Sequence, residues 1–259
     1  MSMDTTELEK LSASWDAKAE EWHRQVGTEG DANRRLNSDP VLWRMLGDVG
    51  GLDVLDAGCG TGYLLLKLME KGARAVGVDV SAGMAGVARR NAAARGAAAD
   101  VRVADCAALN VIGDESMDRV VSNYVLMDLP DMRGAVREFH RVLRPHGRAV
   151  LVFTHPCFSP PDNGFSRLPD GQTVFRWSRP YFDEYEYREE WGHFTSSFIC
   201  YHRPLSEYWR AFTESGFEIV EFCEPTAGPA SVAEIDPQTV NRLRMMPNSV
   251  AFDLRKPGR

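Results

Sequence analysis

Several features of common protein classes are missing from this sequence. Its five cysteines are dispersed without a C-x-x-C pair, which argues against a disulfide framework or a zinc knuckle and favours reduced thiols. It has no run of about 18 apolar residues, the length that a membrane-spanning helix needs. Acidic residues outnumber basic ones, 37 to 30, for a formal net charge of −7, whereas a general nucleic-acid surface needs a basic face. We therefore expect no membrane and no nucleic acid as partners.

What is present fits a globular protein. Hydrophobic residues make up 44% of the 259 residues and charged residues 26%, enough for a sizeable core and a solvated surface. The first ten residues, MSMDTTELEK, are polar and acidic and lack the basic and apolar regions of a secretory signal. We expect a cytoplasmic protein that is a monomer or a homodimer.

Strand and helix patterns alternate through most of the chain. Two amphipathic helices come first, one over about residues 5–25 and one that starts after Pro40 and ends at Gly50 and Gly51. Short β-branched strands separated by helices of about ten residues are typical of a parallel, doubly wound sheet. We therefore predict strands over 53–57, 74–80, 100–105, 117–125, 148–154, 217–222 and 249–255, with helices over 63–71, 82–95, 132–143 and 204–217.

Residues 155–203 interrupt this alternation. They show no helical period, yet they hold nearly half of the chain's Phe, Tyr and Trp residues. The segment starts at the carboxyl end of the fifth strand, where open α/β sheets bind ligands. With Trp15 and Trp22 of the first helix, it is therefore a candidate substrate lid. The alternative is that these aromatic residues pack an extra subdomain against the sheet.

A glycine-rich loop follows the first strand of the alternating region. A dinucleotide-binding loop reads G-x-G-x-x-G. Here Gly58, Gly60 and Gly62 are spaced by two, and Tyr63 stands where the third glycine of that pattern belongs. The loop indicates a ligand that approaches the backbone closely, but its spacing does not match a dinucleotide.

Three neighbouring strands each end in an acid. Asp79, about 20 residues past the glycine loop, is suited to accept both hydroxyls of a ribose. Asp105 suits the exocyclic amine of adenine, and Asp56 suits a ligand ammonium group. A ligand with ribose, adenine and cationic groups but no phosphate fits this set better than NAD does, and S-adenosylmethionine is such a ligand. The alternative for each acid is a helix cap.

Five stretches of the sequence resemble the class I S-adenosylmethionine-dependent methyltransferases. They are VLDAGCGTG, AVGVDVSAGM, VRVADCAAL, MDRVVSNYVLMDLPD and REFHRVLRPHGRAVLVF, in order over roughly residues 38–155. The resemblance implies a Rossmann-like α/β fold with a seven-stranded, mostly parallel sheet, whose antiparallel last strand is inserted between its neighbours. The cofactor contacts that it implies are Asp56, Gly58 and Gly60 at the methionine moiety with Cys59 in the same loop, Asp79 at the ribose, Val80 and Met84 flanking the adenine, Asp105 and Cys106 at its polar edge, and Asn123 beside the methionine carboxylate or sulfonium.

The second half of the chain resembles a narrower group. THPCF, YFDE and YHRPLSEYWRAFTESGF are similar to a large bacterial subfamily of small-molecule methyltransferases. One departure is that many relatives carry a histidine after the fourth strand, where this sequence has Met127 and Asp128. We expect one methyltransferase domain over 1–259, divided into an N-terminal helical cap (1–37), a cofactor-binding core (38–154), the lid insert (155–203) and a C-terminal helix with the last two strands (204–259).

Methyl transfer from a sulfonium is an in-line displacement, in which positioning of the reactants has a large effect. Aromatic faces favour a cation such as the sulfonium. A hydroxyl acceptor would also need a general base, and histidine titrates in the appropriate range. His155, directly after the fifth strand, and His202, before the last helix, are the candidate catalytic residues. The candidate substrate contacts are Trp15, Trp22, Tyr181, Tyr185, His193 and Arg203.

The leading hypothesis is methyl transfer to an oxygen or nitrogen of a small-molecule metabolite. The alternatives are a protein of the same fold that binds the cofactor without transferring methyl, C- or S-methylation, and an NAD-dependent oxidoreductase. No Cys/His spacing suggests zinc, and no acid cluster remains for another metal, so no metal is expected. After the fourth strand, SNYV stands in place of the N-P-P-Y tetrad of many enzymes that methylate amino groups of nucleic acids. With the acidic charge, this argues against a nucleic-acid substrate.

Overall fold

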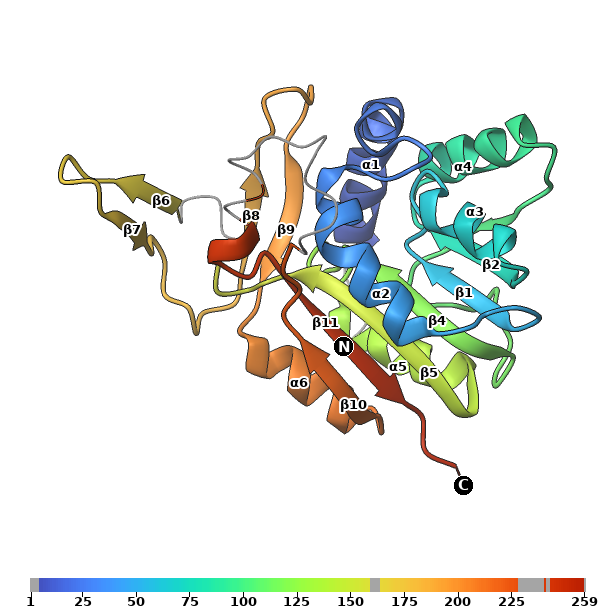
Figure 1. The fold of residues 1–259 in the computed structure, drawn as a ribbon. Helices are drawn as coiled ribbons and strands as arrows, with labels where there is room; N and C mark the ends of the chain where they lie inside the picture. Colours follow the sequence, from blue (N-terminus) through green and yellow to red (C-terminus); the bar gives the residue numbers. More distant parts are fainter. Residues whose placement is uncertain (1–4, 159–163, 228–239, 241–242, 259) are drawn as a thin grey trace.

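The computed structural model describes residues 5–158, 164–227, 240 and 243–258. Seven strands form one sheet in the order β10-β11-β5-β4-β1-β2-β3 (Figure 1). β11 runs antiparallel to both of its neighbours, and the other pairs are parallel. The predicted sheet, with its antiparallel last strand inserted between two others, is confirmed. The strands are β1 Asp53–Ala57, β2 Arg74–Asp79, β3 Asp100–Val103, β4 Met117–Asn123, β5 Leu143–Thr154, β10 Glu218–Cys223 and β11 Ser249–Arg255.

Helices cover both faces of this sheet (Figure 1). Val54 and Leu55 are adjacent on β1, yet Val54 packs with residues of α2 and α3 while Leu55 packs with residues of α5 and α6. Successive side chains of a strand point to opposite faces, so a strand covered on both sides is apolar throughout. The helices are α1 Thr5–Val26, α2 Asp39–Leu46, α3 Tyr63–Glu70, α4 Ala82–Ala94, α5 Met132–Val142 and α6 Leu205–Glu214.

The polar connection between the first two helices contains regular structure. Arg34–Ser38 form a short π-helix, η1, that leads directly into α2. Leu36 of this segment is buried in a small cluster with Ala227 and Leu243. η1 thus lies inside the protein, and one of its residues reaches the cavity described below.

The boundary between α5 and β5 also differs from the sequence prediction. Pro145 and Gly147 are expected to separate the helix from a strand that begins at residue 148, but β5 starts at Leu143, immediately after α5. The ladder with β4 shifts register here, because pairing passes from Leu143 directly to Arg148. The residues between them bulge out of the ladder, which is how a strand accommodates a proline.

The described part of the insert over 155–203 consists of two antiparallel hairpins. One pairs β6 Gly164–Arg167 with β7 Thr173–Arg176 and extends away from the sheet (Figure 1). The other pairs β8 Tyr185–Glu189 with β9 Phe198–His202. This second hairpin packs on α1, with the ring centroid of Phe198 5.4 Å from that of Trp15.

Within the described ranges, no helix is both long enough and apolar enough to cross a membrane. In the same part of the chain, no three His, Cys, Asp or Glu side chains come together as candidate metal ligands. All five cysteines are free thiols.

Candidate active site

A cavity of about 840 Å³, its open mouth included, lies at the carboxyl ends of β1, β2, β3 and β4. This is the end of an open α/β sheet at which ligands bind. α1 lies across it and contributes Leu11, Trp15 and Trp22 to its wall. All of the predicted cofactor contacts line this cavity: Asp56, Gly58, Cys59, Gly60, Asp79, Val80, Met84, Asp105, Cys106 and Asn123.

The glycine loop forms one side of the cavity. Gly58, Gly60 and Gly62 have φ angles of 76°, 52° and 85°, a region that other residues enter only at a cost. The Gly60 N–H donates to Asp79 Oδ2 at 2.8 Å, which ties the loop to the end of β2. A Cβ atom on Gly62 would lie 3.0 Å from Cβ of Ala88. The first two glycines therefore present bare backbone to the cavity, and the third allows α3 and α4 to pack closely.

The three strand-end acids share this cavity as a crowded, buried set. Asp56 is only 2% exposed, and burial together with the nearby Asp79 raises its pKa to about 7. Burial raises the pKa of Asp79 to about 6, although the N–H groups of Ser81 and Gly60 donate to its carboxylate. Burial also raises the pKa of Asp105. Burial disfavours the charged form of each carboxyl group, and a positive charge on a ligand would stabilise that form. The site therefore favours a cationic ligand.

Three buried atoms on the cavity wall have no hydrogen-bond partner among the described residues. They are Asp56 Oδ2, Thr61 Oγ1 and Asn123 Oδ1. Buried polar atoms are almost always bonded in folded proteins. Carboxylate and amide oxygens accept hydrogen bonds from ammonium and hydroxyl groups. The wall therefore fits a ligand that brings such donors.

Arg34 brings a positive charge to the same wall. Its guanidinium lies 5.2 Å from the ring centroid of Trp22 and 5.4 Å from that of Tyr124, and it donates to Asp31 at 2.8 Å. Tyr124 directly follows β4, with a φ of 59°, and its hydroxyl is 2.6 Å from Ser249 Oγ. These contacts place a cation on the cavity wall, so the wall can also hold a ligand carboxylate.

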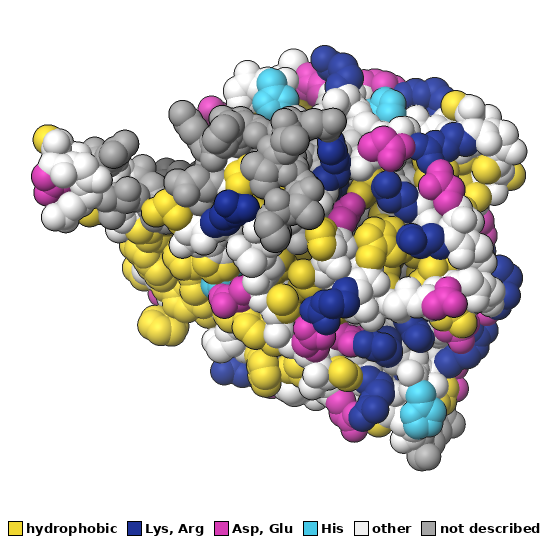
Figure 2. All heavy atoms as spheres, in the orientation of Figure 1, with side chains coloured by type: hydrophobic (Ala, Val, Ile, Leu, Met, Phe, Trp, Pro, Cys, Tyr) yellow, Lys and Arg dark blue, Asp and Glu magenta, His cyan; other side chains and the backbone are white. Residues whose placement is uncertain are grey.

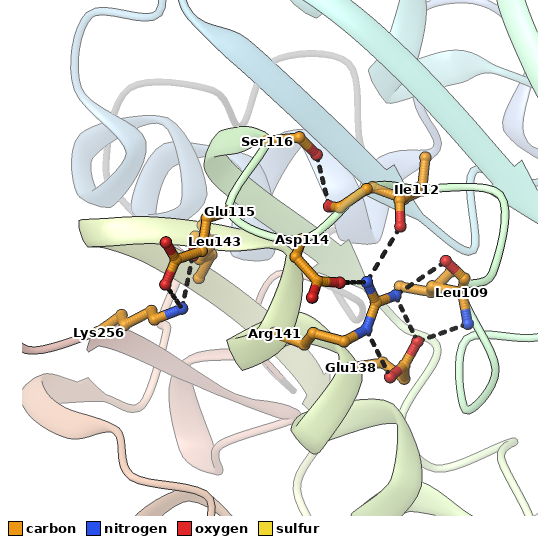
Figure 3. A network of polar contacts seen from close by, with 10 residues as sticks. Leu109, Ile112, Asp114, Glu115, Ser116, Glu138, Arg141, Leu143 and Lys256 are labelled. Carbon is orange, nitrogen blue, oxygen red and sulfur yellow. Dashed lines mark hydrogen bonds and ion pairs between the residues drawn. The ribbon is translucent and has the colours of Figure 1, made fainter.

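A polar network ties the segment of Leu109 and Ile112, which follows Asp105 in the chain, to α5 (Figure 3). Arg141 of α5 donates to the carbonyl oxygens of Leu109 and Ile112 at 2.9 and 3.1 Å. Glu138 accepts the Leu109 N–H at 2.7 Å and pairs with Arg141. This network connects the segment after β3 to α5, so the Asp105 side of the cavity is preorganised.

The sequence prediction missed part of the wall. The signal that identified the acids, position just after a strand, also applies to the residues that follow β4. Thr61 of the glycine loop and Tyr63 and Leu64 at the start of α3 supply three more. Arg34 had no such signal, because it lies in a polar connection far from any strand end. The missed lining residues are Leu11, Val26, Arg34, Thr61, Tyr63, Leu64, Tyr124, Val125, Asp128 and Leu129.

Four of the residues predicted to contact a substrate lie away from the cavity wall, and three of them attach the insert to its surroundings. The buried Arg203 donates to the carbonyl oxygens of Leu129 and Pro130 at 2.8 and 2.9 Å. The hydroxyl of Tyr181 accepts the Leu205 N–H at 2.8 Å. Of the predicted set, Trp15 and Trp22 line the cavity, whereas Tyr181, Tyr185, His193 and Arg203 do not.

Neither predicted general base lines the cavity. In His155, Nδ1 accepts the Cys157 N–H at 3.1 Å, so Nε2 carries the proton and donates to Glu224 Oε1 at 2.9 Å. In His202, Nε2 donates to the carbonyl oxygen of Tyr181 at 2.8 Å. Both residues are 4% exposed. Both imidazoles are thus hydrogen-bonded away from the cavity lining, His155 to Glu224 and His202 to the backbone of Tyr181 within the insert. The general-base role of either histidine stays a prediction.

These two histidines should make the stability depend on pH. Burial lowers the pKa of both His155 and His202, while histidine in an unfolded chain has a pKa of about 6.5. The unfolded state therefore binds more protons, so this stability is present above about pH 6.5 and is lost as the pH falls below it. We expect the midpoint of urea unfolding of the wild type to fall, between pH 7.5 and pH 5.5, relative to that of the double variant His155→Gln/His202→Gln. The comparison with the double variant is needed because the raised pKa values of Asp56 and Asp79 add stability over the same pH range.

The control for this experiment is His193→Gln, because His193 is exposed. The carboxyl groups of the cavity titrate alike in all variants, so the difference between the curves isolates the two buried histidines. Equal slopes for the wild type and the double variant would contradict this prediction.

Residues 55–151 match the model of a protein family described as a methyltransferase domain. The crystal structure of an S-adenosylmethionine dependent methyltransferase from Mesorhizobium loti aligns with a TM-score of 0.73 and 26% identity, over 88% of this chain and 100% of that one. The chain carries a class I S-adenosylmethionine-dependent methyltransferase domain. The sequence prediction of this family is thereby confirmed.

Curated relatives share this methyltransferase domain but differ in their acceptors. Malonyl-[acyl-carrier protein] O-methyltransferase from Hamiltonella defensa is 35% identical over 113 residues, 44% of this chain and 41% of that protein. tRNA 5-carboxymethoxyuridine methyltransferase from Escherichia coli is 32% identical over 149 residues, 54% of this chain and 56% of that protein. The chain thus spans about half the length of the curated relatives it matches. One name specifies a malonyl group and the other a tRNA nucleoside, so the shared domain does not fix the acceptor.

Proposed function

We propose that this protein transfers a methyl group from S-adenosylmethionine to an oxygen or nitrogen of a small molecule. The observation that carries the proposal is the meeting of three strand-end acids, Asp56, Asp79 and Asp105, with Arg34 on one cavity wall of a methyltransferase domain. A ligand that combines adenosine with an ammonium and a carboxylate group matches this set of charges. A dinucleotide, with its negative pyrophosphate, does not.

The residues of the wall suit the parts of this cofactor one by one. Asp79 is suited to the ribose hydroxyls. Asp56 Oδ2 and Asn123 Oδ1 lack partners among the described residues and would accept from the ammonium group, while Arg34 would pair with the carboxylate. When bound, the cofactor supplies an electrophilic methyl group on a sulfonium. The adenine is assigned to Val80, Met84, Asp105 and Cys106.

Two features support a small acceptor. The indoles of Trp15 and Trp22 line the cavity and would exclude water from a reacting centre. On the face shown in Figure 2, acidic and basic side chains of the described residues are interspersed, and the net charge is −7. Binding a nucleic acid depends on neutralising its phosphates with basic side chains. A large polyanion is therefore a poorer match than an uncharged or cationic metabolite.

Calorimetry with S-adenosylhomocysteine, the demethylated cofactor, tests the cofactor assignment. We expect binding in the micromolar range and none with NAD. Incubation with S-adenosylmethionine and a panel of amines, phenols and alcohols, followed by mass spectrometry, tests the transfer. Binding without a methylated product from any acceptor would favour a protein that holds the cofactor without transferring methyl. Absence of S-adenosylhomocysteine binding would overturn the proposal.

A further inference from the structure

Among the described residues that line the cavity, Asp128 is the one acid to which the proposed function assigns no part of the cofactor. It lies in the turn after β4, where its N–H donates to the carbonyl oxygen of Val125 at 2.8 Å. The residue is only 7% exposed. A buried ionisable group on the wall of a ligand cavity is a candidate for contact with a ligand.

The same wall carries the aromatic surface of α1. The indole rings of Trp15 and Trp22 meet edge to face, with centroids 5.3 Å apart, and Leu11 and Leu129 add apolar surface. Indole faces attract cations, and a carboxylate forms strong hydrogen bonds with N–H groups of a cation. A carboxyl group with indole rings therefore suits an ammonium ion attached to an apolar body. A carboxylate placed beside Asp128 would instead be repelled by its charge.

We propose that Asp128 and the indole rings of Trp15 and Trp22 bind the methyl acceptor as an ammonium ion, so that the acceptor is an amine with an apolar or aromatic body. The proposal rests on the function proposed above and narrows its acceptor from oxygen or nitrogen to nitrogen. One proton moves from the bound ammonium to the Asp128 carboxylate, which leaves a neutral amine with a free electron pair. This proton transfer needs no further reactant.

The groups around Asp128 are consistent with this role. Burial raises its pKa to about 8, a hydrogen bond from the Cys200 thiol and the charge of Lys18 oppose the rise, and Glu189 adds to it. Lys18 does not line the cavity, and its Nζ donates to the carbonyl oxygen and hydroxyl of Ser14 at 2.9 and 2.7 Å. Burial also lowers the pKa of Lys18. The other titratable groups that sense the Asp128 charge are Tyr187, Tyr201 and Tyr208.

The carboxyl group of Asp128 thus lacks a cation bonded to it within the described residues. An ammonium ligand would supply one and stabilise the carboxylate. Because the ionised form binds the cation, affinity should rise with pH up to about pH 8, where the free carboxyl group loses its proton, and then level off. A neutral ligand of the same shape should show no such rise.

The experiment uses the full chain saturated with S-adenosylhomocysteine and three probes of similar shape. They are 2-phenylethylamine, 2-phenylethanol and 3-phenylpropionate, which are cationic, neutral and anionic. Tryptophan fluorescence and calorimetry report their binding at several pH values. The test variant is Asp128→Asn. The control is Glu189→Gln, which removes a nearby half-buried acid that does not line the cavity.

We expect the amine to bind at least tenfold more tightly than the other two probes, with an affinity that rises toward pH 8. Asp128→Asn should lose at least tenfold of this affinity and most of its pH dependence, whereas Glu189→Gln should stay within about threefold. Similar affinities for the three probes, no amine binding, or an unchanged Asp128→Asn would overturn the proposal. Binding of S-adenosylhomocysteine is measured separately for each variant, so a failure of the cofactor assignment or of folding is recognised by itself.

Discussion

The variant Asp79→Ala is expected to bind S-adenosylhomocysteine about 100-fold more weakly than the wild type. Each hydrogen bond between a carboxylate and a ribose hydroxyl contributes about 1.5 kcal/mol, so the loss of two corresponds to about two orders of magnitude in Kd. Asp79 also accepts the N–H groups of Gly60 and Ser81, at 2.8 and 2.9 Å. The alanine variant therefore loses ligand contacts and one tie that shapes the glycine loop.

Two further variants separate these effects. Asp79→Asn keeps the shape of the side chain but not its charge, and we expect about a tenfold loss. Asp100→Ala is the matched control, because Asp100 lies at the start of β3, away from the carboxyl ends that line the cavity, and pairs with Arg102. Calorimetry should show unchanged affinity for this control. Unchanged affinity for Asp79→Ala would contradict the ribose assignment.

The strand-end acids could be predicted because a single local pattern determines their position. Once a buried parallel strand is recognised, the residue at its carboxyl end must lie at the ligand-binding edge of the sheet. Asp56, Asp79 and Asp105 all follow this rule and line the cavity. The same rule applies to Tyr124, which directly follows β4. Its importance was missed because no ligand group in the sequence hypothesis required a tyrosine there.

Long-range contacts determine the side-chain positions that could not be predicted from the sequence. His155 directly follows a strand, as the acids do, but its ring points to Glu224, 69 residues later in the chain. Arg34 reaches the cavity because η1 folds back against Trp22 and Tyr124. The residues next to His155 and Arg34 in the sequence do not indicate where either side chain points. The aromatic density of the insert likewise obscured strand patterns, although the sequence YEYRE of β8 alternates in the way that a half-buried strand does.

Replacement of Gly58 in the glycine loop is expected to have a large effect on the stability of the protein. A Cβ atom built on Gly58 would lie 2.7 Å from Cγ1 of Val125, and the φ of Gly58 is 76°. The left-handed backbone costs about 1–2 kcal/mol in an L-residue, and overpacking adds about 1–3 kcal/mol. Because valine is stiff about χ1, it cannot turn away easily. We expect Gly58→Ala to lower the free energy of unfolding by about 3 kcal/mol.

Alanine variants of two other glycines, compared by urea unfolding, separate the backbone cost from the cost of overpacking. Gly27 also has a positive φ, of 61°, but a Cβ atom there would meet no atom within 4 Å. Gly27→Ala should therefore show the backbone cost alone, about 1 kcal/mol. Gly86 lies on α4 with equally open space and without a positive φ, so Gly86→Ala should stabilise the protein by about 0.5–1 kcal/mol. If Gly58→Ala lost no more stability than Gly27→Ala, close contact between the loop and Val125 could not be the reason for a glycine at this position.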